Sequence, residues 1–123
     1  MIAESLSLLK KGSNANILLL SSMSAVDPYY KIGVYGITKA GVSNMVKSLS
    51  VELMPHNIRV NGLSPGLVET EMSNPLTKDN PLVNEKNCAK PEQISSVIAT
   101  ICSDEGSFMN GEVYTVHGGY PRF

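Results

Sequence analysis

The chain has 123 residues, 42% of them hydrophobic and 17% charged, which is enough for one domain core and too short for two ordinary domains. Ten Lys and Arg residues against eleven Asp and Glu give a formal net charge of -1, so no basic excess favours nucleic acid as a partner. The longest apolar run, 17–20, is far shorter than the roughly 20 residues of a membrane span. Glu4 does not fit a signal peptide, and we expect an intracellular protein, most simply a cytoplasmic one.

The first two predicted elements are a helix and a buried strand. Ile2, Leu6 and Leu9 lie on one face of a helix that stops before Gly12. Residues 16–20 form an almost wholly apolar run, as in a parallel strand covered on both faces. No turn or strand precedes the helix, so the chain begins abruptly.

The longest predicted helix covers residues 34–54. Its apolar residues recur at helical spacing, and Pro55 ends the pattern. Residues 58–61 predict a second strand, which runs into a turn at 64–66 (Ser-Pro-Gly).

The last third of the chain is predicted to hold a loop, a helix and a strand. Residues 73–90 are polar, and Pro75 and Pro81 are expected to break any helix there, which leaves a lid-like segment. An amphipathic helix starts at Pro91, and residues 112–116 form a strand closed by two glycines. The alternating order predicts the α/β class with parallel strands. Three strands make a small sheet, so either strands are missing ahead of the chain, which the abrupt start favours, or another chain completes the sheet.

Neither cysteine suggests a special site. Cys88 and Cys102 lack the spacing of a metal site or a redox pair, and His56 and His117 do not cluster with them. We predict no metal site and two reduced, structural thiols.

A serine, a tyrosine and a lysine suggest chemistry. Tyr35 and Lys39 fall on or beside the apolar face of the predicted helix over 34–54. Because a buried ammonium is costly, one interpretation is that Lys39 extends past Tyr35 into solvent. Ser22 favours a catalytic interpretation, because it follows the predicted strand at the sheet edge where open α/β sheets bind ligands.

With Ser22 thirteen positions before Tyr35 and Lys39 four after it, the sequence resembles the short-chain dehydrogenase/reductase family. The segments 35–39 (YGITK), 61–66 (NGLSPG) and 116–119 (VHGG) extend the resemblance over essentially the whole chain. Within the family, residues 51–53, 57–61 and 65–70 are similar to NADP-dependent carbonyl and retinal reductases of the dehydrogenase/reductase member 4 type.

This resemblance implies both a fold and an activity. The fold is the C-terminal part of a Rossmann-like, doubly wound parallel sheet, so residues 1–123 would be one partial domain, the catalytic half. The activity is NADP(H)-dependent reduction of ketones, aldehydes or retinal to alcohols, with NAD(H) as the other cofactor to consider. The partner is then a small carbonyl or alcohol substrate.

The three candidate residues have distinct expected roles. Hydride addition leaves negative charge on the carbonyl oxygen, and Tyr35 is the expected proton donor. A Lys39 ammonium about 4 Å away would favour the phenolate by about 1 kcal/mol in water and about 4 kcal/mol at an effective dielectric of about 20. Ser22 would donate a hydrogen bond that holds the substrate oxygen near the Tyr35 hydroxyl.

The resemblance also implies a cofactor-binding set. Tyr35 and Lys39 would contact the nicotinamide end, Lys39 through the ribose hydroxyls. The backbone of Val68 and the side chain of Thr70, after Pro65 and Gly66, would hold the carboxamide. Pro65-Gly66 taken alone is equally well an ordinary turn.

Several features of the family are missing or altered. No G-x-G-x-x-G motif follows a predicted strand, and by the resemblance that turn, the NAD/NADP selector and an active-site asparagine would all precede Met1. His117 stands where the family usually has Asp, and a loop over 70–90 that looks shorter than usual leaves the substrate open. The last three residues, PRF, match no peroxisomal signal, so neither a peroxisomal nor a mitochondrial location is supported.

A second hypothesis is a truncated, non-catalytic module that acts through helix-mediated interaction or dimerisation. Small residues form a second face of the helix over 34–54 and suit close helix packing, although such residues also line ordinary solvent-exposed faces. In the family this helix packs against its own copy, so both hypotheses predict a homo-oligomer through the 34–54 helix. The small residues are Gly36, Ala40, Gly41, Ser43, Asn44, Ser48 and Val51.

Overall fold

A three-stranded parallel sheet forms the centre of the computed structural model, which describes residues 2–27, 32–78, 83 and 87–119. The strand order is β1 (Asn16–Leu20), β2 (Arg59–Pro65), β5 (Val113–Val116). Leu18 pairs with Asn61 across β1 and β2, and Leu63 pairs with Tyr114 across β2 and β5. The predicted α/β class with parallel strands is confirmed.

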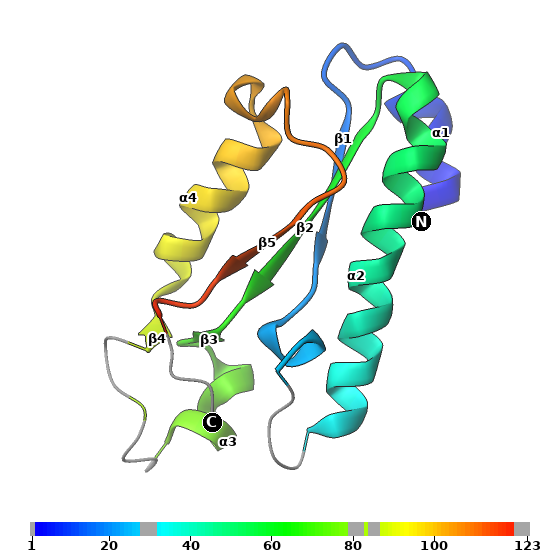
Figure 1. Ribbon diagram of the computed structural model, residues 1–123. Coiled ribbons are helices and arrows are strands. Elements are labelled where there is room, and N and C mark those ends of the chain that lie inside the picture. Colours follow the sequence, from blue (N-terminus) through cyan, green and yellow to red (C-terminus); the bar gives the residue numbers. More distant parts are fainter. Residues whose placement is uncertain (1, 28–31, 79–82, 84–86, 120–123) are drawn as a thin grey trace.

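Helices cover both faces of this sheet. In Figure 1, α2 (Gly33–Leu53) lies on one side of the strands and α4 (Pro91–Cys102) on the other. Between these layers the β2 side chains Val60 and Leu63 are completely buried. The continuous apolar run of β1 after Asn16 fits this arrangement, because a strand covered on both faces needs no polar side.

Two apolar clusters hold the layers together. On the α2 side, Leu53, Ile58 and Val60 pack with Leu6 and Leu9 of α1 (Ile2–Leu9). On the α4 side the buried residues are Leu63, Ile94 and Ile101, with Tyr114 packed against them. The helices predicted from Ile2, over 34–54 and from Pro91 are therefore confirmed to within a few residues, because their apolar faces are these clusters.

Buried polar groups fix the end of the sheet opposite the site described below. Arg59 is 9% exposed and donates to the carbonyl oxygens of Ile101 and Met109, each at 3.1 Å. Asn61 is fully buried and donates to the same Met109 oxygen at 2.7 Å. These bonds satisfy carbonyl groups at the end of α4 and in the loop before β5, which would otherwise be costly to bury.

The second strand is longer than predicted. It continues through Ser64 and Pro65, which pair with Thr115 and Val116, so the expected turn at 64–66 starts later. Proline has no N–H to donate, but Gly66 donates to the Val116 oxygen at 2.9 Å and continues the ladder.

The segment predicted as a helix-free lid contains regular structure. A short helix, α3 (Asn74–Thr77), follows a 3-10 turn at Glu71–Ser73, and Pro75 lies in its first turn, where a missing N–H costs nothing. The strand β3 (Leu67–Val68) pairs in parallel with β4 (Cys88–Ala89). The prediction that Pro75 breaks a helix is therefore wrong; Pro81 lies outside the described residues.

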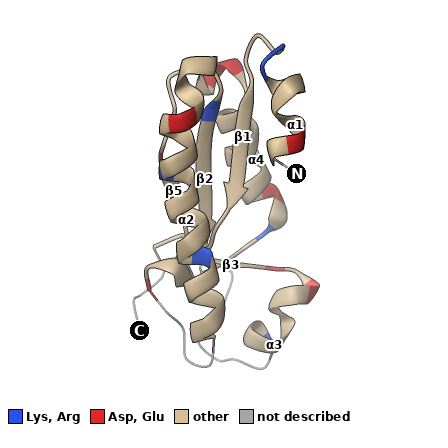
Figure 2. Ribbon diagram, turned by 90° about the vertical axis from the view of Figure 1, so that its right-hand side faces the viewer, with Lys and Arg blue, Asp and Glu red and all other residues tan. Residues whose placement is uncertain are grey.

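Charged side chains are spread over the surface. Figure 2 shows Lys, Arg, Asp and Glu distributed over several elements, with both signs on α2. Lys47 and Glu112 form an exposed ion pair at 2.9 Å. Within the described part of the chain, no helix is long and apolar enough to cross a membrane.

Candidate active site

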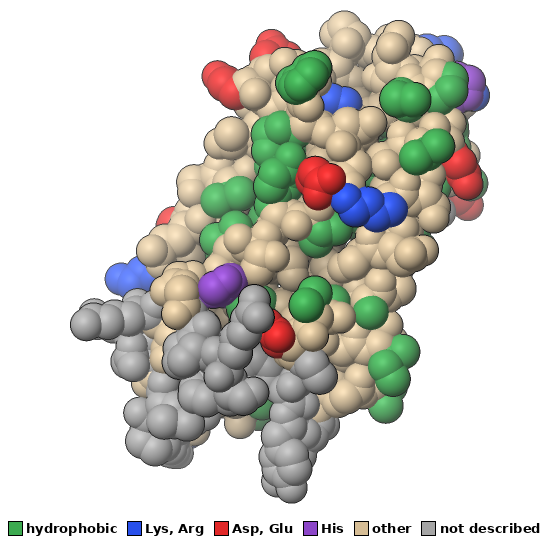
Figure 3. All heavy atoms as spheres, in the orientation of Figure 1, with side chains coloured by type: hydrophobic (Ala, Val, Ile, Leu, Met, Phe, Trp, Pro, Cys, Tyr) green, Lys and Arg blue, Asp and Glu red, His purple; other side chains and the backbone are tan. Residues whose placement is uncertain are grey.

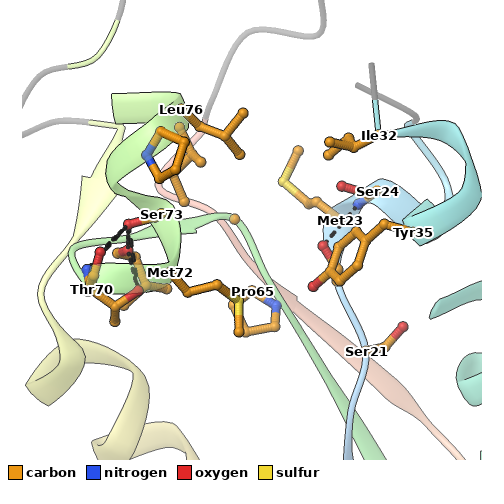
Figure 4. Close-up of a pocket in the computed structure, with 15 residues that line it drawn as sticks. Ser21, Met23, Ser24, Ile32, Tyr35, Pro65, Thr70, Met72, Ser73 and Leu76 are labelled. Carbon is orange, nitrogen blue, oxygen red and sulfur yellow. Dashed lines mark hydrogen bonds between the residues drawn. The ribbon is translucent and has the colours of Figure 1, made fainter. Parts of the chain in front are cut away.

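The carboxyl ends of β1 and β2 meet at one edge of the sheet, and a pocket of about 460 Å³ opens there. Figure 4 shows its two walls: Met23, Ile32 and Tyr35 on one side, and Thr70, Met72 and Leu76 across from them. The remaining lining residues come from the ends of the two strands and the turns that follow them. They are Ser21, Ser22, Ser24, Pro65, Gly66, Leu67, Val68, Ser73 and Pro75.

Ser22 stands at the point where β1 gives way to a 3-10 turn at Met23–Ala25. Its backbone is extended, and its Oγ accepts a hydrogen bond from the Ser24 N–H at 3.2 Å, which caps the turn. Because that bond uses an oxygen lone pair, the hydroxyl hydrogen remains able to donate toward the pocket. The structure thus places Ser22 where the sequence predicted it.

Tyr35 lies in the first turn of α2 and lines the same pocket, with 40% of the residue exposed. The next residue, Gly36, is buried against the 3-10 turn that Ser22 caps. A Cβ at Gly36 would lie 2.5 Å from the carbonyl oxygen of Ser24, far inside normal contact. Glycine at this position therefore allows α2 to approach the turn closely enough to bring Tyr35 and Ser22 into one pocket.

Lys39 lies one helical turn after Tyr35 and turns back toward the sheet. Its Nζ donates to the Leu20 carbonyl oxygen at 2.8 Å and lies 5.6 Å from the centroid of the Tyr35 ring. The interpretation that Lys39 extends into solvent is therefore wrong, because the end of β1 offers its ammonium a carbonyl partner. The arrangement places a positive charge beside the tyrosine ring.

The residues predicted to bind the cofactor lie mainly on the opposite wall. Pro65, Gly66, Val68 and Thr70 line the pocket with Tyr35, whereas Lys39 is not among the lining residues. The Val68 oxygen accepts from Ser73 Oγ at 2.6 Å, and Thr70 begins the 3-10 turn that holds Ser73. The Glu69 and Thr70 N–H groups donate to the Ala89 oxygen at 2.8 Å and to Ser73 Oγ at 3.1 Å. The role of these residues in holding a nicotinamide stays a prediction.

An apolar part of the pocket was missed by the sequence analysis. Met72 and Leu76, which are 83% and 37% exposed, face Met23 and Ile32 across the opening. Met72 and Leu76 are four residues apart, which is helical spacing, but Met72 lies just before the segment predicted to be polar and Leu76 lies within it. These side chains give the pocket an apolar entrance.

Two titratable groups, Cys88 and Glu105, have pKa values shifted from their ordinary values. Partial burial, and then the charge of Glu69, raise the pKa of the Cys88 thiol, which favours its neutral form. At the other end of the molecule, a hydrogen bond from the Ser103 hydroxyl lowers the pKa of Glu105. Both cysteines are free thiols, and the described residues contain no group of three His, Cys, Asp or Glu able to hold a metal.

Comparisons with known proteins give a consistent result. A family model described as enoyl-(acyl carrier protein) reductase matches residues 1–121. Dehydrogenase/reductase SDR family member 4 from Oryctolagus cuniculus is 31% identical over 92% of this chain and 46% of its own length. The chain thus spans about half the length of the curated relatives it matches.

Solved structures show the same partial coverage. The 3-ketoacyl-(acyl-carrier-protein) reductase from Brucella melitensis, complexed with NADH, has a TM-score of 0.88 and 29% identity over 98% of this chain and 51% of its own. The L-sorbose reductase from Gluconobacter frateurii, complexed with NADPH and L-sorbose, has a TM-score of 0.81 and 27% identity over 97% of this chain and 53% of its own. A family match over nearly the whole chain, together with the same fold in these structures, shows that the chain belongs to the short-chain dehydrogenase/reductase family.

Proposed function

We propose that this chain carries the proton-transfer and substrate-binding half of an NADP(H)-dependent carbonyl reductase. The observation that carries the proposal is that Ser22 and Tyr35 line one pocket, with the Lys39 ammonium 5.6 Å from the Tyr35 ring centroid. Reduction of a carbonyl to an alcohol needs a hydride and a proton; Tyr35 would supply the proton, and Ser22 and Lys39 would stabilise the charge that develops.

Each group has one task in the proposed reaction. Ser22 donates a hydrogen bond to the carbonyl oxygen and fixes its position. Tyr35 Oη gives its proton to that oxygen as negative charge develops there. Lys39 offsets the negative charge left on the phenolate. A reduced nicotinamide supplies the hydride when it is bound.

The pocket also supports a substrate class. Met23, Ile32, Met72 and Leu76 give it an apolar entrance, whereas the polar groups gather near Ser22 and Tyr35. An apolar wall favours an aromatic ketone or an apolar α-dicarbonyl over a heavily hydroxylated sugar, because unpaired hydroxyl groups are costly to bury. The relatives above are complexed with NADH in one case and NADPH in another. NADP(H) is proposed on the similarity to dehydrogenase/reductase member 4 proteins, which also provide the first curated matches.

The non-catalytic alternative has less support. A module that acts only through a helix face does not need Ser22, Tyr35 and Lys39 to converge at one sheet edge. The exposed face of α2 is compatible with either function.

The experiment is a reductase assay on a chimera in which this chain replaces the matching part of the Brucella melitensis reductase. We expect oxidation of NADPH or NADH that depends on an aromatic ketone or an α-dicarbonyl, and a fall in kcat of roughly a hundredfold or more on Lys39→Met. Lys47→Met is the matched control, since Lys47 lies on the same helix and its ammonium pairs with the exposed Glu112 carboxylate, away from the pocket. A folded chimera without carbonyl-dependent turnover, or with equal effects of the two lysine variants, contradicts the proposal.

A further inference from the structure

We propose that Ser21 is a positioning residue that holds Lys39 beside Tyr35; this inference rests on the proposed function. Ser21 is the residue between the end of β1 and the candidate catalytic Ser22. It is 4% exposed, and its backbone N–H donates to the Leu63 oxygen at 2.7 Å, which fixes it to β2. Figure 4 shows its hydroxyl directed toward α2, away from the middle of the pocket.

The Ser21 hydroxyl bonds the backbone of α2 at the lysine itself. Its Oγ donates to the Lys39 carbonyl oxygen at 2.9 Å and lies 2.7 Å from the Ser43 hydroxyl, one turn further along the helix. The preceding residue bonds the other end of the lysine, because the Leu20 oxygen accepts from Lys39 Nζ at 2.8 Å. The last residue of β1 and the residue after it therefore hold both the side chain and the main chain of Lys39.

This pairing sets the depth and rotation of α2 against the sheet. A lysine side chain is long and flexible, so its ammonium stays in one place only if its backbone and its head group are both held. If the Ser21–Lys39 bond is lost, α2 can turn or slide slightly at this point. Lys39 Nζ would then no longer lie within hydrogen-bonding distance of the Leu20 oxygen. Its positive charge would move away from the Tyr35 ring.

Ser50 provides a matched comparison within the same helix. It is 6% exposed, and its Oγ donates to the Lys47 oxygen at 2.8 Å. This bond is as short as that of Ser21 but lies within α2, so it joins no strand to the helix. Removing either hydroxyl should weaken the fold, whereas only the loss of Ser21 should disturb Lys39.

The first test uses the 123-residue chain itself and requires no activity. Lysines are methylated with formaldehyde and a mild reductant, and the initial rate at Lys39 is divided by that at Lys47 by peptide mass spectrometry. We expect Ser21→Ala to raise this ratio by about fivefold, as for the loss of one buried hydrogen bond, and Ser50→Ala to leave it unchanged. If Ser21→Ala does not fold, Ser21→Cys replaces it, because a thiol keeps the shape of the side chain and is a weaker hydrogen-bond donor to the Lys39 oxygen; the ratio should rise in the same direction.

The second test measures kinetics in the chimera. Ser21→Ala should lower kcat roughly tenfold or more through misplacement of Lys39, with little change in the KM of the carbonyl substrate, because the Ser21 hydroxyl is bonded to α2. Ser50→Ala should change neither parameter. An unchanged lysine ratio, or equal kinetic effects of the two serine variants, overturns the inference. If the lysine ratio rises while Lys39→Met leaves turnover intact, the proposed function fails and the positioning of Lys39 stands.

Discussion

The three candidate catalytic residues depend on their immediate neighbours for their positions. Ser22 is held by the turn that it caps, Tyr35 by the close approach at Gly36, and Lys39 by the Leu20 oxygen. Sequence spacing alone brings Tyr35 and Lys39 to one side of a helix but does not set the direction of a lysine side chain. The carbonyl at the end of β1 sets that direction, and this is why the solvent-directed interpretation of Lys39 was wrong.

The close approach at Gly36 leads to a stability prediction. In Gly36→Ala the new methyl group meets the Ser24 carbonyl oxygen, so we expect a loss of about 1–3 kcal/mol in the free energy of unfolding. Gly41→Ala is the control on the same helix, because nothing lies within 4 Å of a Cβ there; it should gain up to about 1 kcal/mol from helix propensity. Urea unfolding followed by circular dichroism measures both, and equal effects of the two variants would contradict the packing described here.

At the scale of elements, α2 contributes one face to the core and another to the surface. Gly36 is buried and Ser43 bonds Ser21, so two members of the small-residue face predicted from the sequence lie against the rest of the molecule. The other five members are exposed; they are Ala40, Gly41, Asn44, Ser48 and Val51. The most exposed apolar residues of α2 are Val34, Ile37 and Val51, at 77%, 73% and 68%. Figure 3 shows hydrophobic side chains at the lower right of the molecule, where α2 begins in Figure 1.

We propose that this outer face of α2 mediates self-association. In a two-fold interface each copy contributes the same residue, so Ile37→Asp would place two like charges in apolar surroundings and raise the dimer Kd by at least about tenfold. Val26→Asp is the control, since Val26 is 78% exposed but follows the 3-10 turn rather than lying on α2. Light scattering coupled to size-exclusion chromatography follows the dimer. A dimer unaffected by Ile37→Asp would exclude this face.

At the scale of the whole molecule, the sequence predicts the main layers and misses short elements. The three helices from Ile2, over 34–54 and from Pro91, and the strands paired in the main sheet, follow from apolar periodicity sustained over several residues. Strands β3 and β4 have two residues each, which is too few for a periodic pattern, and only tertiary pairing defines them. The turn of α3 was missed because proline is unfavourable within a helix but acceptable in its first turn.

The pocket could be predicted only in part for a related reason. The candidate catalytic residues Ser22, Tyr35 and Lys39 could be predicted from their spacing and the family resemblance. The position of the pocket could be predicted because ligands bind at the carboxyl ends of strands in a parallel sheet. Its apolar entrance depends on where Met72 and Leu76 lie, and that position is set by the 3-10 turn and the short helix α3 that carry them rather than by any sequence motif.

The loss of one phenolic hydroxyl tests the proposed site most directly. In the chimera, Tyr35→Phe removes the proposed proton donor and keeps the ring, so kcat for reduction of an aromatic ketone should fall roughly a hundredfold or more while the protein stays folded. Tyr114→Phe is the matched control, because Tyr114 packs on the core between β5 and α4 and does not line the pocket. It should keep near-normal turnover. A Tyr35→Phe variant with the same turnover as Tyr114→Phe would contradict the assignment of Tyr35 as the proton donor.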